Sequence, residues 1–303
     1  MNLVQAFFNE KITKTGSSRL IANTNNLKTN SFLFDVKFKA PADLKEGDLQ
    51  DSHVFDFLKD VYVTIALRLG SGNGSAVNIV SSCPAFLLLQ FSDFVAGVSM
   101  ESPKVKDGYI RVSGALPIGF FSMGSRDSLD CIVNVASSDK LPEDGFQLTI
   151  SNIYNFDTNV SIRTYQCTKP TGASQPYTNV LGVYYSGDKV LNKEAVIQDQ
   201  LNTMNTGIED GMALANSVGH FEVFTRFAKL YEDPFAVSQN VNFKIPADDT
   251  EAQVLIVGYH FDTALLVSNA GESDALKANL LSIVKKDDTE KYEYLQALGL
   301  VKE

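Results

Sequence analysis

The chain has 303 residues, of which 44% are hydrophobic, so it is long and apolar enough to form one large domain or two of ordinary size and is not a largely disordered chain. Its formal net charge is −10, and direct binding of nucleic acid is disfavoured because phosphate contacts need clustered Lys and Arg. The apolar runs are all shorter than the roughly 18 residues that a membrane-spanning helix requires.

The N-terminal segment is predicted to be an amphipathic helical arm over residues 1–16. Apolar residues recur at spacings of four, which places them on one helical face: Leu3, Val4, Phe7, Phe8 and Ile12. This stripe packs either on its own chain or on a neighbouring subunit or a membrane surface. We take Leu3, Phe7 and Phe8 as the candidate contact residues with a membrane or a neighbouring subunit.

Strands dominate the segment from 17 to 168, which we predict to be a first β-domain. Apolar and polar residues alternate in runs that are bounded by turn residues, and a nearly continuous apolar run is predicted to be a strand buried on both faces. The alternating runs are 31–41, 60–70, 107–124, 128–138, 148–158 and 159–167, and the continuous run is 85–98. About eight or nine strands at this spacing are typical of a β-sandwich or jelly roll.

A segment rich in Pro, Ser and Thr at 169–179 is predicted to link this domain to a second one at 180–271. Strand-like runs return there, but residues 193–214 follow a helical period and predict a helix inserted between strands. The last residues, 272–303, are predicted to form short helices, because leucines recur there at helical spacing after a Ser-Asp cap.

Two stretches share one layout. Residues 148–158 read LTISNIYNFDT and residues 254–263 read VLIVGYHFDT, and both follow an acidic turn and end in Tyr-x-Phe-Asp-Thr. Duplication of a β-domain accounts for this, and chance is the alternative because Tyr, Phe and Thr all favour strands. The sequence therefore predicts two tandem β-domains with equivalent strands at these two places.

The polar residues do not form a catalytic or metal-binding motif. The three histidines lack a metal-ligand spacing, and the glycines at 70–74 do not have the spacing of a phosphate-binding loop. Cys83, Cys131 and Cys167 are predicted to be free buried thiols of a protein made in a reducing compartment. We therefore predict no catalytic residue, no cofactor and no metal site, while acidic turns leave calcium binding open.

The set of features, namely tandem β-domains, a Pro/Ser-rich linker, an inserted helix, an amphipathic N-terminus and an acidic chain, resembles the double jelly-roll major capsid proteins of tailless, internal-membrane-containing icosahedral bacteriophages. The resemblance is one of layout from about residue 17 to residue 271. It implies a mainly β fold of two tandem jelly-roll domains with an inserted helix and short terminal helices. The second half shows fewer clear strands than a jelly roll needs, so another sandwich stays open there.

The resemblance also implies a function. Such a protein is not an enzyme; it assembles as a homotrimer of pseudo-hexameric outline and then as an icosahedral lattice around a membrane. Its partners would be other copies of itself, other capsid proteins and a viral membrane, without direct contact to nucleic acid. It would be made in the host cytoplasm and reside in the virion. The alternative is a β-sandwich binding protein such as a viral spike or a carbohydrate-binding adhesin.

Overall fold

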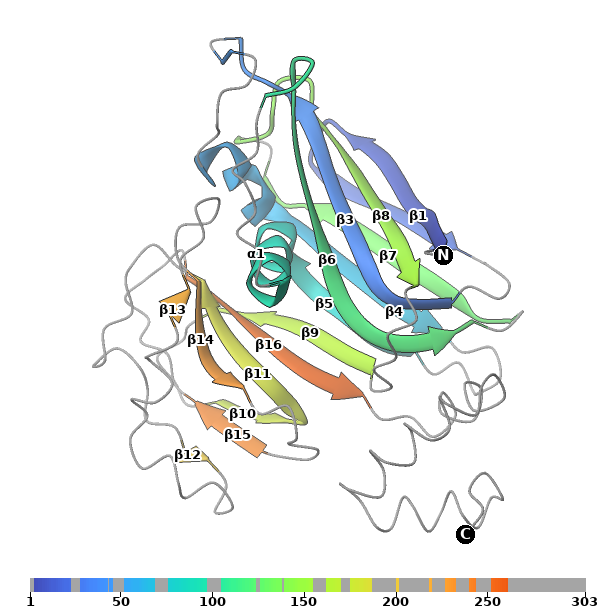
Figure 1. Ribbon diagram of the computed structural model, residues 1–303, viewed down its shortest axis with the longest axis vertical. Helices are drawn as coiled ribbons and strands as arrows, with labels where there is room; N and C mark the ends of the chain where they lie inside the picture. Colours follow the sequence, from blue (N-terminus) through green and yellow to red (C-terminus); the bar gives the residue numbers. More distant parts are fainter. Residues whose placement is uncertain are drawn as a thin grey trace.

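The computed structural model is mainly β (Figure 1). It describes the following residues: 3–22, 28–42, 44–45, 52–68, 76–96, 105–123, 126–137, 139–154, 162–169, 175–186, 200–201, 218–219, 227–232, 240–243 and 252–260. The description below concerns these residues.

The first half contains eight strands that form two sheets. The strands are β1 (Leu3–Ile12), β2 (Gly16–Ala22), β3 (Lys28–Lys39), β4 (Val61–Arg68), β5 (Ala76–Pro84), β6 (Tyr109–Ser122), β7 (Ser128–Val135) and β8 (Phe146–Tyr154). One sheet has the order β1-β8-β3-β6, and the other contains the order β5-β4-β7-β2. Successive strands pass from one sheet to the other, except that β4 and β5 are neighbours in one sheet. This is the strand order of a jelly roll, and we call this unit the first roll.

The core of the first roll lies between its two sheets. Inward residues alternate with outward ones along each strand, as in β4, where Val61, Val63 and Ile65 are fully buried. Aromatic rings pack edge to face across the core, with Phe7 and Phe32 at 5.2 Å between ring centroids. A short 3-10 helix, η1 (Ser52–Asp60), closes one end of this core.

The second half repeats the same arrangement. Its strands are β9 (Ile162–Thr168), β10 (Gln175–Thr178), β11 (Val180–Ser186), β12 (Gln200–Leu201), β13 (Val218–Gly219), β14 (Phe227–Glu232), β15 (Asn240–Phe243) and β16 (Gln253–His260). They give the orders β9-β16-β11-β14 and β10-β15-β12. Adding eight to the numbers of the first roll's strands reproduces the first order in full and the second without β13, which pairs with β14 instead. This unit is therefore a second roll.

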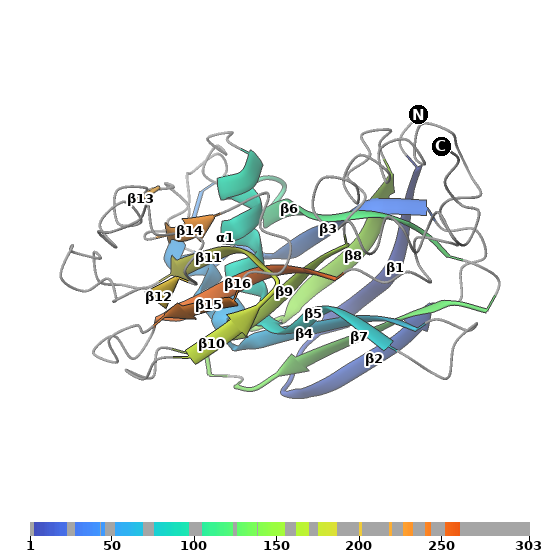
Figure 2. The same ribbon diagram turned by 90° about the horizontal axis from the view of Figure 1, so that it is seen from below.

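The two rolls share a sheet. β5 pairs in parallel with β9, with Val80 opposite Tyr165 and Ser81 opposite Gln166. This pairing joins four strands of the first roll to five of the second in the nine-stranded order β13-β14-β11-β16-β9-β5-β4-β7-β2. Figure 2 shows this long sheet passing through both rolls, with the four-stranded sheet over its first-roll end.

The strand order confirms that the repeated stretches occupy equivalent places. β8 is the eighth strand of the first roll, and β16 is the eighth strand of the second. Each is a central strand with two antiparallel neighbours, the first and the third strand of its own roll. The last residues of both stretches lie outside the described residues.

The predicted N-terminal helix is wrong, because residues 3–12 form β1 and pair with β8 along their whole length. A β-bulge explains the misleading period. Ala6 lies opposite Ser151 and Phe8 opposite Ile150, so Phe7 is an extra residue on β1. The bulge allows consecutive phenylalanines to be buried together, which mimics a helical stripe.

The structure also differs from the predicted local structure at two other places. The apolar run at 85–98 contains a helix, α1 (Ala85–Ala96), where we expected a strand. The helix predicted at 193–214 is a separate prediction: residues 200–201 form β12, and the rest of that range lies outside the described residues. The predicted linker at 169–179 includes β10. The predicted C-terminal helices at 272–303 lie outside the described residues.

The domain boundaries stay a prediction, but the strand order indicates how the described residues divide. β1, which we predicted to be an arm, belongs to the four-stranded sheet of the first roll. β9, which we predicted to close the first domain, takes the first place in the second roll. The described strands thus fall into residues 3–154 and residues 162–260.

Candidate assembly surfaces

The two phenylalanines predicted to contact a membrane or a capsomer lie inside the protein instead. Phe7 and Phe8 are 4% and 1% exposed and belong to the core of the first roll. They are therefore not contact residues for another molecule. Leu3 begins β1 opposite Tyr154, and its side chain lies outside the described part of the chain, so its contact role stays a prediction.

The surface that joins the rolls is built around α1. The helix follows β5 of the first roll and lies against β6, and it also reaches β14 of the second roll (Figure 1). On the side of α1 that faces the second roll, the Phe91 ring packs edge to face against Tyr165 of β9 and Tyr184 of β11, at 5.5 and 4.8 Å between ring centroids. All three side chains are buried, so this aromatic cluster forms part of a contact between the rolls.

Two buried polar side chains donate hydrogen bonds across this contact. The hydroxyl of Tyr165 donates to the carbonyl oxygen of Pro117 on β6, and the hydroxyl of Ser186 on β11 donates to the Gln90 side chain on α1. Burial raises the pKa of Tyr165, so the phenol stays protonated and remains a donor. Because buried polar groups are costly when unpaired, these bonds fix the rolls in one relative position.

A close approach of backbone to helix holds α1 against β6 of the first roll. Gly114 of β6 lies beneath α1, and a Cβ added there would meet the Ser92 hydroxyl oxygen at 2.7 Å. The Ser92 hydroxyl donates to the carbonyl oxygen of Ala115 at 2.9 Å. Glycine at this position therefore allows α1 to lie directly on the sheet.

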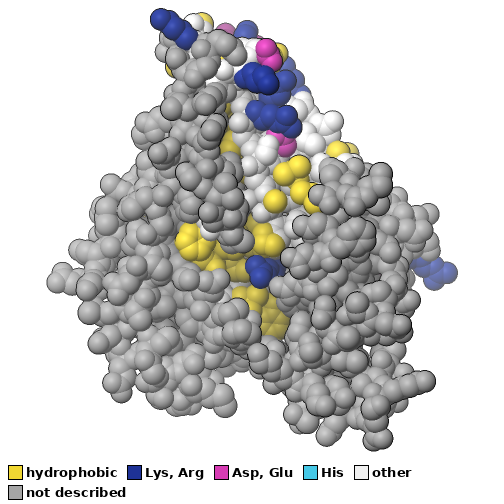
Figure 3. Space-filling model, in the orientation of Figure 1, with side chains coloured by type: hydrophobic (Ala, Val, Ile, Leu, Met, Phe, Trp, Pro, Cys, Tyr) yellow, Lys and Arg dark blue, Asp and Glu magenta, His cyan; other side chains and the backbone are white. Residues whose placement is uncertain are grey.

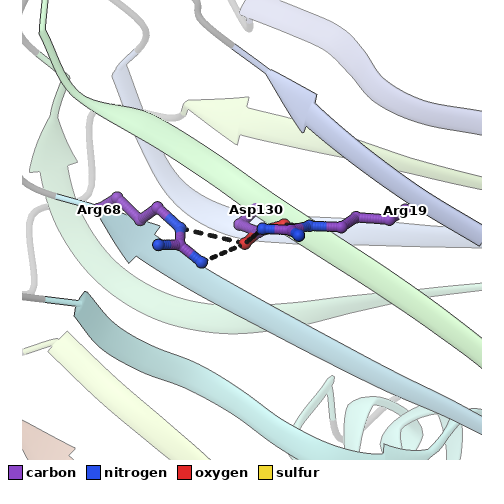
Figure 4. Close-up of polar contacts among 3 residues, drawn as sticks. All are labelled: Arg19, Arg68 and Asp130. Atoms are coloured by element: carbon purple, nitrogen blue, oxygen red, sulfur yellow. Dashed lines mark hydrogen bonds and ion pairs between the residues drawn. The ribbon is translucent and has the colours of Figure 1, made fainter.

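A charged cluster lies on the outer face of the nine-stranded sheet. Asp130 of β7 is 2% exposed and is held between Arg19 of β2 and Arg68 of β4, which are each about half exposed (Figure 4). Arg19 donates to both carboxylate oxygens at 2.8 and 2.6 Å, and Arg68 donates twice to Oδ2 at 3.0 and 2.6 Å. These bonds link three neighbouring strands at the β2 end of the sheet.

The two arginines also set the charge state of this carboxylate. The hydrogen bonds from Arg19, together with those from Arg68 and the two positive charges, hold the pKa of Asp130 below its usual value, although burial opposes them. Asp130 is therefore ionised near neutral pH. The cluster carries one negative and two positive charges.

The outer face of the four-stranded sheet is polar and carries aligned cations. The strand register places Lys11 of β1, Gln147 of β8, Lys37 of β3 and Arg111 of β6 side by side in one row. Lys39 lies two residues further along β3. We call Lys11, Lys37 and Arg111 the basic row. Figure 3 shows Lys and Arg side chains gathered on the upper part of the molecule in this view, with few acidic ones between them.

A cleft of about 520 Å³ opens at one end of the first roll. Its floor is formed by the buried rings of Phe38 and Phe57, and its rim includes Lys39 and Asp144, whose side chains form an ion pair at 3.1 Å. Within the described residues there is no group of three His, Cys, Asp or Glu side chains that could hold a metal ion. The cleft therefore combines an apolar floor with a charged rim.

The three cysteines are free thiols in the structure, and two of them, Cys83 and Cys131, are fully buried. Burial raises the pKa of Cys131 to about 12 and that of Cys167 to about 12, and it also raises the pKa of Cys83. The thiolate form is thus disfavoured at all three. Among the described helices, none has the length and apolar character needed to span a bilayer.

Comparison with solved structures identifies the fold. A chain in the atomic structure of Sulfolobus Turreted Icosahedral Virus is similar with a TM-score of 0.50 at 8% identity, over 94% of this chain and 98% of that chain. The fold is a double jelly roll. The STIV major capsid protein gives a TM-score of 0.47 at 8% identity, over 86% of this chain and 96% of that one. The major capsid protein P2 from bacteriophage PM2 gives 0.37 at 8% identity, over 87% and 99%.

Comparison of sequences finds no match for this chain, whereas comparison of structures does. The sequence matches no protein-family profile, and no curated protein is significantly similar to it. The double jelly roll is thus recognised from strand order and shape, and two of these neighbours are named as major capsid proteins. The contact at α1 and the basic row were not among the sequence predictions, because the first was predicted to be a strand and the second depends on the register between strands.

Proposed function

We propose that this chain is a structural major capsid protein, without enzymatic activity, that forms an icosahedral virion shell. The observation that supports this most directly is the repeated strand order, β1-β8-β3-β6 in one roll and β9-β16-β11-β14 in the next, within one chain. A chain with two similar rolls joined by a shared sheet is a suitable block for a lattice, because each roll presents an equivalent set of outer faces.

The capsomer in this proposal is a homotrimer. Three copies of a two-roll chain place six rolls around a threefold axis, and the resulting outline is close to a hexagon, which packs closely on a curved lattice. We propose that the lattice surrounds a viral membrane and meets other capsid proteins, without direct contact to nucleic acid. The net charge of −10 agrees with the last point.

Synthesis in the host cytoplasm, followed by residence in the virion, completes the proposal. Free thiols at Cys83, Cys131 and Cys167 are compatible with folding in a reducing compartment. The fold supplies its own stability through burial and aligned strands, so it does not require disulfide crosslinks.

Native mass measurement of the purified full chain tests this function. We expect a species of three times 33.2 kDa, and regular arrays or closed particles by electron microscopy as the concentration rises. A chain that stays a 33.2 kDa monomer at high concentration and forms no arrays would refute the coat protein and favour the binding alternative, a spike or a carbohydrate-binding adhesin. Binding of the monomer to glycans would then be the next measurement.

A further inference from the structure

The basic row on the outer face of the four-stranded sheet has an arrangement that stability alone does not explain. Lys37 lies directly opposite Arg111 on the neighbouring strand, and like charges in that position destabilise a sheet. Lys11 lies in the same row, on the other side of Gln147. Neighbouring strands are about 4.8 Å apart, so the row spans roughly 14 Å from Lys11 to Arg111.

The row is only partly neutralised by its own chain. Arg111, whose side chain is 65% exposed, donates to Asp35 at 2.6 Å, and Ser113 donates to the same oxygen. The Lys37 ammonium lies over the Tyr109 ring, 4.2 Å from its centroid, which stabilises the cation without removing its charge. Lys37 and Lys11 are exposed and form no ion pair with the described residues.

Charge on the rest of this face does not cancel the row. Lys39, whose side chain is 66% exposed, pairs with Asp144 on the turn before β8. Asp35 and Asp144 are thus the carboxylates bound by cations here; Lys39 engages Asp144, and both Arg111 and Ser113 engage Asp35. This face is therefore locally basic on a chain with a net charge of −10, so the excess of carboxylates lies elsewhere on the same chain.

We propose that the basic row is a docking surface for carboxylates on a second copy of this chain, in a head-to-tail contact. The inference rests on the proposed coat function, in which every copy meets identical acidic copies. A head-to-tail contact uses two different surfaces and closes into a ring when the rotation allows it. Local pairing of the row with carboxylates offsets the repulsion between copies that each carry −10.

The range of the interaction favours carboxylates on a neighbouring copy over a phosphate surface. A membrane or a polynucleotide is an extended charged surface, so it would meet the net negative charge of the whole chain as well as the row. A carboxylate cluster on a docked copy lies within the screening length of about 10 Å at 0.1 M salt and therefore responds mainly to the row. Lys11 and Lys37, which form no ion pair with any described residue, are available for this contact.

The test compares charge-reversed variants of the full chain by sedimentation. The variant Lys11→Glu/Lys37→Glu reverses the row, and Lys14→Glu/Lys140→Glu makes the same change in net charge at two exposed turn residues outside it. A third variant, Lys11→Arg/Lys37→Arg, retains the charge. The quantity measured is the chain concentration at which half of the protein is assembled, at about 0.1 M and about 1 M salt.

We expect the reversed row to raise this concentration roughly tenfold at low salt relative to the turn control, and the arginine variant to assemble like the wild type. High salt should shrink the difference, because it shortens the screening length to about 3 Å. We expect the melting temperature of Lys11→Glu/Lys37→Glu to equal that of the wild type. The loss of assembly would then come from docking and not from folding.

Three other results would overturn the proposal. If the wild type assembles and the reversed row behaves like the turn control, the coat function stands and the docking surface is wrong. If the wild type does not assemble at any concentration or salt, the coat function itself fails, and the docking surface fails with it. If assembly is unaffected but phosphatidylserine vesicles bind the wild type and not the reversed variant, the row binds a lipid surface instead.

Discussion

Replacing Phe91 by alanine should weaken the coupling between the rolls more than it weakens either roll. The ring is 1% exposed and packs against Tyr165 and Tyr184 of the second roll, so the truncation removes two aromatic contacts and leaves a cavity. Truncation of a buried phenylalanine costs about 3–5 kcal/mol. Against a net stability of about 5–15 kcal/mol for a typical domain, this loss is large enough to measure.

The matched control is Phe55→Ala. Phe55 is 0% exposed and packs against Phe38 at 5.7 Å, within the core of the first roll. Both variants should therefore lower the melting temperature by a similar amount. Only Phe91→Ala should split the calorimetric transition in two, because only that change removes contacts between the rolls.

Limited proteolysis provides an independent readout of the same coupling. In Phe91→Ala, cleavage between the rolls should yield a protected fragment that contains β1 to β8. If Phe91→Ala and Phe55→Ala unfold in the same single transition and give the same fragments, the aromatic cluster at α1 does not couple the rolls, and the reasoning fails.

Three further results are expected. Deleting residues 1–14 should destabilise the isolated chain strongly, because it removes β1 and buried side chains such as Phe8 that contribute about 1.5–3 kcal/mol each; an unchanged melting temperature would contradict the β1 assignment. The contribution of Asp130 to the free energy of unfolding should be fully present above its ordinary pKa and lost as the pH falls through its lowered pKa. Asp130→Asn should therefore flatten the pH dependence of the melting temperature in that acidic window. Equal slopes for the variant and the wild type would contradict this role of Asp130. Iodoacetamide at pH 8 should modify Cys131 and Cys167 only after unfolding, since burial raises the pKa of each to about 12, and rapid labelling of the native chain would show that the thiols are accessible.

The parts of the fold that the sequence predicts well are those in which one face is buried. The runs at 31–41 and 128–138 alternate cleanly and become β3 and β7, because each strand turns one side to the core and the other to solvent. The repeated endings of 148–158 and 254–263 similarly predict equivalent strands, and the sheet orders confirm their equivalent places.

The parts that the sequence conceals have identifiable physical causes. α1 is buried on nearly all sides, so its apolar run has no period; its length and its lack of β-branched residues before Val95 are the signals that favour a helix. The bulge at Phe7 breaks the alternation of β1. β12 and β13 are two residues long, too short for any pattern. The basic row depends on pairing between strands, which a single sequence does not reveal.

The position of α1 also orders events during synthesis. Once Tyr154 has been made, all eight strands of the first roll exist, and N-terminal domains generally fold first on the ribosome. The aromatic side of α1 is then bare, because Tyr165 and Tyr184, which cover Phe91, belong to strands that have not yet emerged. The nascent chain is thus most prone to aggregation after the first roll has been made and before the second has emerged. A chaperone would act on the chain during this interval.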